Sequence, residues 1–262
     1  EKLKLDLFTE VINWEEMKEF QIAMFKSGVP HLDLPQDLAF IGVLYRYAAK
    51  YNIKYILNGG NISTESVLMP LEILYWGTDM VHVKDILKKF STKKLKNYPF
   101  TNVLYHKFYL RYFRGIKVFK PLNYIDYLKS DAMAELENIY GWKPYPQKHF
   151  ESRFTKFFEG YWLPTRFNYD MRRNQFSSLI LTNQMDRKEA LELLKNPSYD
   201  KDELENDLNY ISSKLRITVN ELKSFHKLPL SYYWDYKNQR KLFSLGEKIL
   251  NLIGNARRGG SY

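Results

Sequence analysis

The sequence predicts an α/β protein in which a parallel sheet covered by helices is followed by a mainly helical C-terminal region. Residues 5–12 alternate apolar and polar side chains, two helical patterns follow, and a short apolar run then ends at the Gly-Gly pair 59–60. The order strand, helix, helix, strand is typical of a parallel sheet with helices on its faces. The second half of the chain shows helical periodicity, so we expect the sheet within residues 1–120.

The first helix is predicted to begin after Asn13, which caps it, with Glu16 at the third helical position as in a capping box. Gly28 is expected to end this helix, because glycine readily adopts the left-handed conformation of a helix C-terminus. A second helix is predicted from Pro35, which suits a first helical turn, to about Tyr51.

A strand is predicted at residues 54–57, and its carboxyl end opens into a polar loop with Gly59, Gly60 and Asn61. Open α/β sheets bind their ligands at the carboxyl ends of the strands. Glycine has no Cβ, so its backbone can approach a phosphate closely. The loop is therefore a candidate cradle for a nucleotide or an adenylated intermediate. The alternative is an ordinary strand-to-helix turn.

Residues 67–120 are rich in aromatic residues and lysine, and we expect helices and loops there. Residues 142–173 are predicted to be irregular. Further helices are predicted at residues 121–140, 179–194, 200–215, 218–227 and 236–252. We divide the chain into the C-terminal part of an α/β domain (1–120), a helical region (121–254) and a flexible tail (255–262).

Composition narrows the class of protein. Of the 262 residues 45% are hydrophobic, enough for a core, and the absence of cysteine excludes disulfides and thiolate metal sites within this sequence. No apolar run has the length of a membrane span and no signal peptide is recognisable, so we expect a cytoplasmic location. The 5 histidines lack zinc-site spacing, and we expect no metal site. GxSxG, Walker A and GxGxxG motifs are also absent.

The formal net charge is +10, and basic residues cluster at 84–96 and 111–120. A basic surface attracts nucleic acid, an anionic membrane or an anionic small substrate such as a nucleotide sugar. Runs of like charge are also common on solvated helix faces, and the sequence leaves these interpretations open.

Residues 148–161 combine charges with aromatic side chains. Lys148, Arg153 and Lys156 offer cations that suit phosphates, and Glu151 offers a carboxylate that can orient a nucleophile. The alternative is a buried ion-pair network that locks this segment to the core.

Two smaller charged groups also have two interpretations. Arg172 and Arg173 follow Asp170, and they are either an anion-binding pair or surface charges beside a helix cap. Asp33 and Asp37 lie at the start of a predicted helix, where capping is a simpler explanation than a metal site.

Several distinctive stretches are spread in order over residues 11 to about 200. They are 11–16 (VINWEE), 33–37 (DLPQD), 48–51 (AAKY), 55–61 (YILNGGN), 122–127 (LNYIDY), 148–154 (KHFESRF) and 170–173 (DMRR). Together they resemble the N-acetyl sugar amidotransferase family, bacterial enzymes that make sugars for surface polysaccharides such as the lipopolysaccharide O-antigen or for flagellar glycans.

The resemblance implies an ATP pyrophosphatase (PP-loop) fold and a reaction. ATP, with Mg²⁺, activates the oxygen of a sugar acetamido group as an adenylate, because an amide carbonyl is a poor electrophile. Ammonia from a glutaminase partner, with or without a cyclase-like subunit, then displaces AMP and leaves an acetamidino group. Positive groups must stabilise the phosphates, and water must be excluded. The substrate is an N-acetyl sugar, expected to be nucleotide-linked.

The resemblance also assigns roles to residues. The expected catalytic residues are Lys148, Glu151 and Arg153; the cofactor-binding residues are Gly59, Gly60, Asn61, Thr64 and Glu65; the substrate-binding residues are Asp37, Arg172 and Arg173. The family's SGGxDS loop and zinc knuckle are absent from this sequence. We therefore expect a preceding segment to carry them, and these residues alone to lack pyrophosphate chemistry.

Two other functions compete with this one. A PP-loop enzyme acting on tRNA is suggested by the net charge and the 16% aromatic content, although we expect no nucleic-acid partner. A non-catalytic helical scaffold for the glutaminase is the second. Strongly salt-dependent RNA binding would distinguish the tRNA enzyme.

Overall fold

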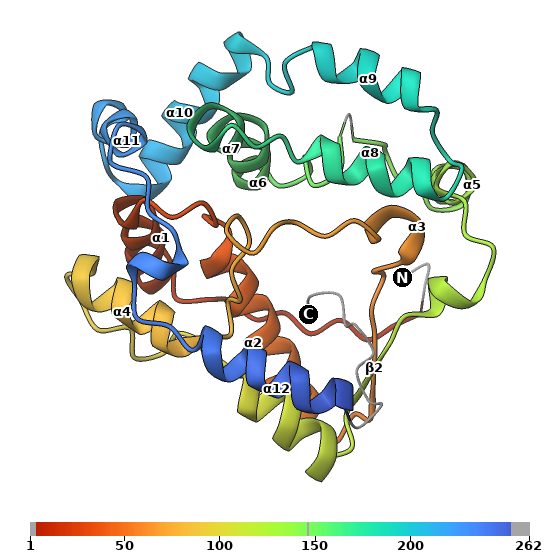
Figure 1. The fold of residues 1–262 in the computed structure, drawn as a ribbon, viewed down its shortest axis with the longest axis horizontal. Coiled ribbons are helices and arrows are strands. Elements are labelled where there is room, and N and C mark those ends of the chain that lie inside the picture. Colours follow the sequence, from red (N-terminus) through yellow and green to blue (C-terminus); the bar gives the residue numbers. More distant parts are fainter. Residues whose placement is uncertain (1–3, 146, 253–262) are drawn as a thin grey trace. The chain divides into compact units, whose positions relative to one another are not determined.

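The computed structural model describes residues 4–145 and 147–252, and these form mostly helices (Figure 1). Within them the sheet consists of one parallel pair of strands, β1 (Tyr55–Leu57) and β2 (Lys117–Phe119). The predicted α/β class with a parallel-sheet PP-loop domain is therefore wrong, since a pair of three-residue strands is too small to be the central layer of such a domain.

The expected strand at residues 5–12 does not form. Leu5, Leu7 and Val11 are 75%, 89% and 87% exposed, so their alternation marks no buried face. Alternating apolar residues specify a strand where one face is covered, and that cover is absent here. The second expected strand does form as β1, but only Ile56 in it is buried.

Contacts divide the chain into two interleaved compact units. The sheet unit comprises residues 1–12, 55–68 and 117–226, and the helical unit comprises residues 13–54, 69–116 and 227–262.

The helical unit has its core between its first helices. Its elements are α1 (Trp14–Ser27), α2 (Leu34–Lys50), α4 (Met80–Phe90), the π-helix η1 (Leu104–Phe113), the 3-10 helix η5 (Tyr233–Asp235) and α12 (Arg240–Leu252). Helix α1 packs against α2 and α4. Phe20, Met24 and Phe25 of α1 and Val83 and Ile86 of α4 are fully buried, and burial of such side chains stabilises the unit by roughly 1.5–3 kcal/mol each.

The sheet unit combines β1 and β2 with the remaining helices. Its helices are α3 (Ile62–Glu65), η2 (Pro121–Tyr124), α5 (Lys129–Glu135), η3 (Leu136–Tyr140), α6 (Arg153–Phe157), η4 (Phe158–Trp162), α7 (Leu163–Phe167), α8 (Arg172–Leu181), α9 (Arg187–Lys195), α10 (Lys201–Leu215) and α11 (Val219–His226). Helix α3 packs on α8, and α6 packs on α10. Phe157, Trp162, Leu163 and Leu222 are buried in this unit.

The predicted helix ends at Asn13 and Gly28 and the predicted start of a helix at Thr218 are confirmed, whereas the Asp33 side chain makes no capping hydrogen bond and the Glu16 carboxylate bonds to the Lys96 and Asn97 amides instead of closing a capping box. The Asn13 side chain accepts hydrogen bonds from the amides of Glu15 and Glu16 at 3.1 and 3.2 Å, and α1 ends at Gly28 with φ 73°. Thr218 Oγ1 likewise accepts from the Glu221 amide at 3.1 Å at the start of α11. These caps depend on neighbouring residues, so local sequence suffices to predict them.

Two other local predictions are wrong. The segment 142–173 is not irregular, because α6, η4 and α7 run consecutively through its centre. The single helix expected at 179–194 is two helices, α8 and α9. Asp186 separates them, and its side chain accepts from the Lys188 amide at 2.6 Å to cap α9. The expected tail at 255–262 lies outside the described residues.

Candidate functional site

The glycine loop lies at the carboxyl ends of both strands. Leu57 pairs with Phe119 in the parallel register, and the Asn58 amide donates to the Phe119 carbonyl at 2.9 Å. Asn58 and Lys120, the next residues of the two strands, therefore leave the sheet at the same edge (Figure 1). The loop from β1 and a lysine from β2 are brought together by this pairing.

Gly60 is the closest point of the loop to charged side chains. A Cβ at this position would lie 2.7 Å from Asn58 Oδ1, 2.9 Å from Glu65 Oε2 and 3.3 Å from Lys120 Nζ. The same Asn58 oxygen accepts a hydrogen bond from the Gly60 amide at 2.6 Å. A side chain at Gly60 would therefore displace the ends of these polar side chains, whereas a Cβ at Gly59 would meet nothing within 4 Å.

Asn61 holds the loop to the short helix α3. Its side-chain oxygen accepts from the Thr64 amide at 2.9 Å and from the Thr64 hydroxyl at 3.2 Å, and its amide group donates to the Gly59 carbonyl at 3.2 Å. Asn61 is buried. Asn61 and Thr64 therefore position the loop and Glu65, and their polar atoms already have partners.

Lys148 pairs with the Glu65 carboxylate, Lys120 Nζ lies with that carboxylate beside Gly60, and the charge of Lys148 acts on Lys129; we call these three lysines the basic rim. Lys148 Nζ donates to Glu65 Oε1 at 2.6 Å. Burial lowers the pKa of Lys129, and the nearby charge of Lys148 lowers it further. Burial also raises the pKa of Tyr127, with an added effect from Glu65. Two lysines beside one carboxylate, with a third lysine near Lys148, leave an excess of positive charge that favours an anion such as a phosphate.

The residue next to Lys148 forms a pair that the sequence did not reveal. His149 Nδ1 lies 2.9 Å from Glu159 Oε1, and Glu159 is a buried residue of the π-helical turn η4. In the sequence Glu159 is one acidic residue among many, and no spacing rule singles it out. Lys120 and Lys129 were also not selected as site residues. A signal for Lys120 was present, since it follows a short apolar run.

The other expected catalytic residues lie elsewhere in the sheet unit. The Arg153 guanidinium pairs with the buried Asp207 carboxylate, stacks 4.2 Å from the Tyr210 ring centroid and donates to the Asn206 carbonyl at 3.1 Å. Glu151 is exposed in the turn before α6. Arg153 therefore belongs to an ion-pair network, which was the alternative interpretation of residues 148–161.

Two of the expected substrate-binding residues, Arg172 and Arg173, lie in the sheet unit. Arg172 is buried, its guanidinium donates to the Asp170 carboxylate at 2.7 Å and to the Leu193 carbonyl at 3.1 Å, and Arg173 is exposed. Asp37 belongs to the helical unit, where its carboxylate lies 3.2 Å from His31 Nε2. The substrate roles of these residues stay predictions.

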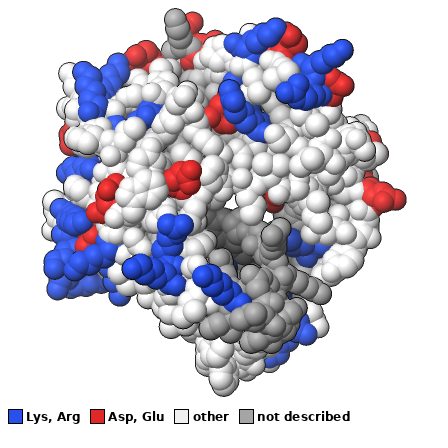
Figure 2. Space-filling model, in the orientation of Figure 1, with Lys and Arg blue, Asp and Glu red and all other residues white. Residues whose placement is uncertain are grey.

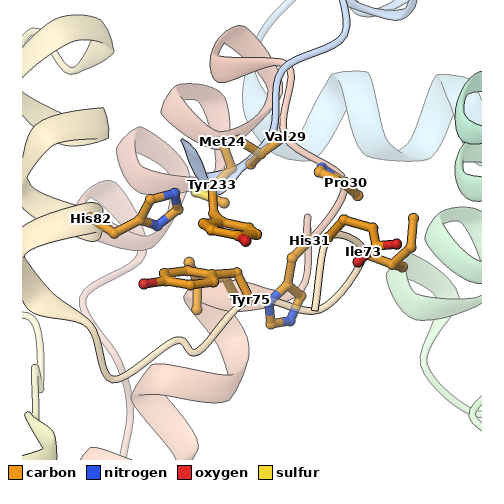
Figure 3. A pocket seen from close by; sticks show the side chains of 10 residues that line it. Met24, Val29, Pro30, His31, Ile73, Tyr75, His82 and Tyr233 are labelled. Carbon is orange, nitrogen blue, oxygen red and sulfur yellow. The ribbon is translucent and has the colours of Figure 1, made fainter. Parts of the chain in front are cut away.

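The helical unit contains a small aromatic pocket (Figure 3). The rings of Tyr75 and Tyr233 stack at 4.4 Å, His82 lies to one side of this stack, and His31 lies to the other. The Tyr75 hydroxyl donates to the Asp79 carboxylate at 2.7 Å. The cavity measures about 10 Å³, room for roughly one water molecule, so it does not admit a nucleotide or a sugar.

In the basic cluster at 84–96, Lys89 Nζ pairs with the Asp85 carboxylate at 2.9 Å, and acidic side chains of α1 bind the loop after α4. Glu16 accepts hydrogen bonds from the amides of Lys96 and Asn97 at 2.9 and 3.0 Å, and Glu19 accepts from the Ser91 hydroxyl at 3.0 Å. The lysines of α4 are exposed, and Figure 2 shows basic side chains gathered over that helix at the left of the view. The cluster is therefore a solvated helix face beside a loop that acidic groups hold in place.

Between residues 4 and 145 and between 147 and 252, no group of three or more His, Asp or Glu side chains is placed to hold a metal ion. We therefore assign no protein ligand set to the Mg²⁺ that the resemblance implies. Over the same residues, no helix combines the length and the apolar character that crossing a bilayer requires.

Fold and site define a mainly helical protein with a glycine loop beside a basic rim. Residues 151–250 match a family model described as LPS biosynthesis protein WbpG-like, C-terminal domain. The match links this region to a lipopolysaccharide-biosynthesis family, which agrees with the polysaccharide side of the resemblance drawn from the sequence. No match was found among curated proteins or among solved structures.

Proposed function

We propose that the chain acts in lipopolysaccharide biosynthesis as an ATP-dependent amidotransferase that converts a sugar acetamido group into an acetamidino group. The observation that carries the proposal is the match of residues 151–250 to the WbpG-like C-terminal domain. The basic rim and Gly60 supply the local chemistry, because they form an anion-receptive loop in the same unit as most of the matched residues.

The reaction needs two steps with a balanced outcome. The amide oxygen attacks the α-phosphorus of ATP, pyrophosphate leaves, and the oxygen becomes a leaving group. Ammonia then attacks the amide carbon, the carbon–oxygen bond breaks, and AMP departs with that oxygen. The net change is amide, ammonia and ATP to amidine, AMP and pyrophosphate, and ammonia comes from a glutaminase partner.

The residues of this chain are proposed to hold and orient phosphate. Lys120 and Lys148 would pair with phosphate oxygens, while the Gly60 backbone would allow close approach. Glu65 holds Lys148 in place at 2.6 Å, and a bound phosphate would compete with Glu65 for this cation. Water excluded from the loop would favour ammonia as the nucleophile.

The experiment uses the strain that carries the gene. Deleting the gene should replace an acetamidino sugar of the lipopolysaccharide by the corresponding N-acetyl sugar, measured by mass spectrometry of the released glycan. Wild-type chain and Lys195→Met should restore the amidine, whereas Lys120→Met with Lys148→Met should not. Lys195 forms an exposed pair with Glu192 at 2.6 Å and so matches the Lys148 pair in length. An unchanged glycan in the deletion strain refutes the proposal.

A further inference from the structure

His149 and Glu159 form a pair that reaches from the surface of the sheet unit into its interior. Nδ1 of the imidazole lies 2.9 Å from Oε1 of the carboxylate. The His149 side chain is 41% exposed, whereas that of Glu159 is 6% exposed. Since Nδ1 is occupied, Nε2 is the ring nitrogen available to a substrate.

The pair is held in an unusual local structure. Glu159 lies in the π-helical turn η4, and such turns are frequent at functional sites. His149 has φ 69°, a left-handed conformation that costs a non-glycine residue on the order of 1 kcal/mol or more. The second carboxylate oxygen of Glu159, Oε2, is buried and has no hydrogen-bond partner among the described residues. A buried oxygen of this kind opposes folding, so packing alone does not account for the pair.

The neighbouring residue closes the carboxylate off from solvent. A Cβ at Gly160 would lie 2.7 Å from the Tyr199 ring and 3.1 Å from the Phe150 ring, so aromatic side chains pack directly over this turn. The Gly160 carbonyl also accepts from the Ser198 hydroxyl at 2.9 Å. Glu159 is thereby fixed in position, and a fixed carboxylate fixes the orientation of the imidazole that it contacts.

Three charged groups act on the imidazole. Burial lowers the pKa of His149, but the hydrogen bond and the charge of Glu159 outweigh it and raise the pKa above its ordinary value. Lys148 lowers this pKa and Glu151 raises it. The imidazolium form is thus stabilised by Glu159, as expected for a base that accepts a proton during a reaction.

We propose that His149 is the general base of the amidine-forming step and that Glu159 is its positioning residue. This inference rests on the proposed function. Lys148, the preceding residue, belongs to the basic rim, and its charge acts on the His149 imidazole.

The proposed step is balanced. Ammonia forms a bond to the activated amide carbon, and one proton leaves its nitrogen for Nε2 of His149. The carbon–oxygen bond then breaks and its electron pair leaves with AMP. Glu159 stabilises the imidazolium across Nδ1 without itself taking the proton. Solvent returns His149 to its neutral form.

The first test follows the His149 ring by NMR titration of the full protein and needs no activity. The wild-type pKa should lie above the ordinary value of about 6.5, and Glu159→Gln should lower it. Glu192→Gln, an exposed carboxylate variant in the same unit, should leave it unchanged. A wild-type value below 6.5, or no shift in Glu159→Gln, overturns the inference and leaves the proposed function intact. If Glu159→Gln does not fold, the pKa of His149 in the wild-type protein alone decides the test.

The second test measures amidine formation by the full protein with an ammonium salt as nitrogen source. His149→Gln should lower kcat by about 10²–10⁴-fold with unchanged thermal unfolding. In Glu159→Gln the acid limb of the pH–kcat/KM profile should move to lower pH, because the base then stays neutral at lower pH. Full kcat in His149→Gln overturns the base role. Failure of the proposed function is read separately, from an unchanged glycan in the deletion strain.

Discussion

Lys148 Nζ lies 2.6 Å from Glu65 Oε1, and this ion pair joins two segments separated by 83 residues in sequence. Both side chains are partly exposed, so we expect the pair to contribute less than about 1 kcal/mol to stability. Its importance is positional, because it holds a cation of the basic rim beside the glycine loop.

Lys148→Met should weaken the binding of inorganic pyrophosphate about tenfold, equivalent to about 1.4 kcal/mol, because one charge-assisted hydrogen bond is lost. The melting temperature should change little. Isothermal titration calorimetry with pyrophosphate and thermal unfolding measure the two effects. Lys195→Met removes a pair of the same length and should leave pyrophosphate binding unchanged. Equal weakening by the two variants would argue against a specific site.

The two glycines of the loop offer a matched pair of variants. Gly60→Ala should displace Glu65 and Lys120, because its Cβ would lie 2.9 and 3.3 Å from their side-chain ends. We expect weaker pyrophosphate binding and little change in stability, because the ends of flexible side chains can move at low cost. Gly59→Ala should change both by little, since its Cβ meets nothing within 4 Å. The same calorimetric and unfolding measurements apply, and equal behaviour of the two variants contradicts the geometry.

The sequence predicts local structure better than it predicts the sheet. The caps at Asn13 and Thr218 form because their partners are two or three residues away. The extent of a sheet depends on partners far along the chain, and alternation at residues 5–12 carries no information about whether a partner exists. The fold class was wrong for this reason.

The candidate site shows the same limit. Gly59 and Gly60 were both selected as part of a nucleotide cradle, and the structure shows close neighbours around Gly60 alone. The contacts of Lys148 with Glu65 and of Arg153 with Asp207 depend on residues far apart in sequence. Lys148 and Arg153 are both basic residues of one short segment. The sequence therefore did not indicate that Lys148 contacts Glu65 beside the loop while Arg153 contacts Asp207 of α10. Glu159 was missed because only its burial distinguishes it.

Replacing Arg172 tests whether this residue, predicted to bind substrate, instead stabilises the fold. Arg172→Ala should lower the free energy of unfolding by about 3 kcal/mol, because it leaves the Asp170 carboxylate without its partner and removes the hydrogen bond to the Leu193 carbonyl at 3.1 Å. Arg173→Ala, at an exposed position, should change it by less than about 0.5 kcal/mol. Urea unfolding measures the free energy of unfolding of both variants. Stability equal to wild type in Arg172→Ala would return this residue to the list of ligand-binding candidates.

His82 should make the stability of the protein depend on pH. Burial lowers its pKa to about 4, and neither ring nitrogen has a hydrogen-bond partner within the described residues. The unfolded chain therefore binds a proton that the folded chain rejects between about pH 6.5 and 4. The stabilising contribution is fully present above pH 6.5 and is lost as the pH falls toward 4, with a total on the order of 3 kcal/mol. His82→Phe keeps a ring against Tyr75 and should flatten this dependence in urea unfolding at a series of pH values. A slope that persists unchanged in His82→Phe would assign the effect to other groups.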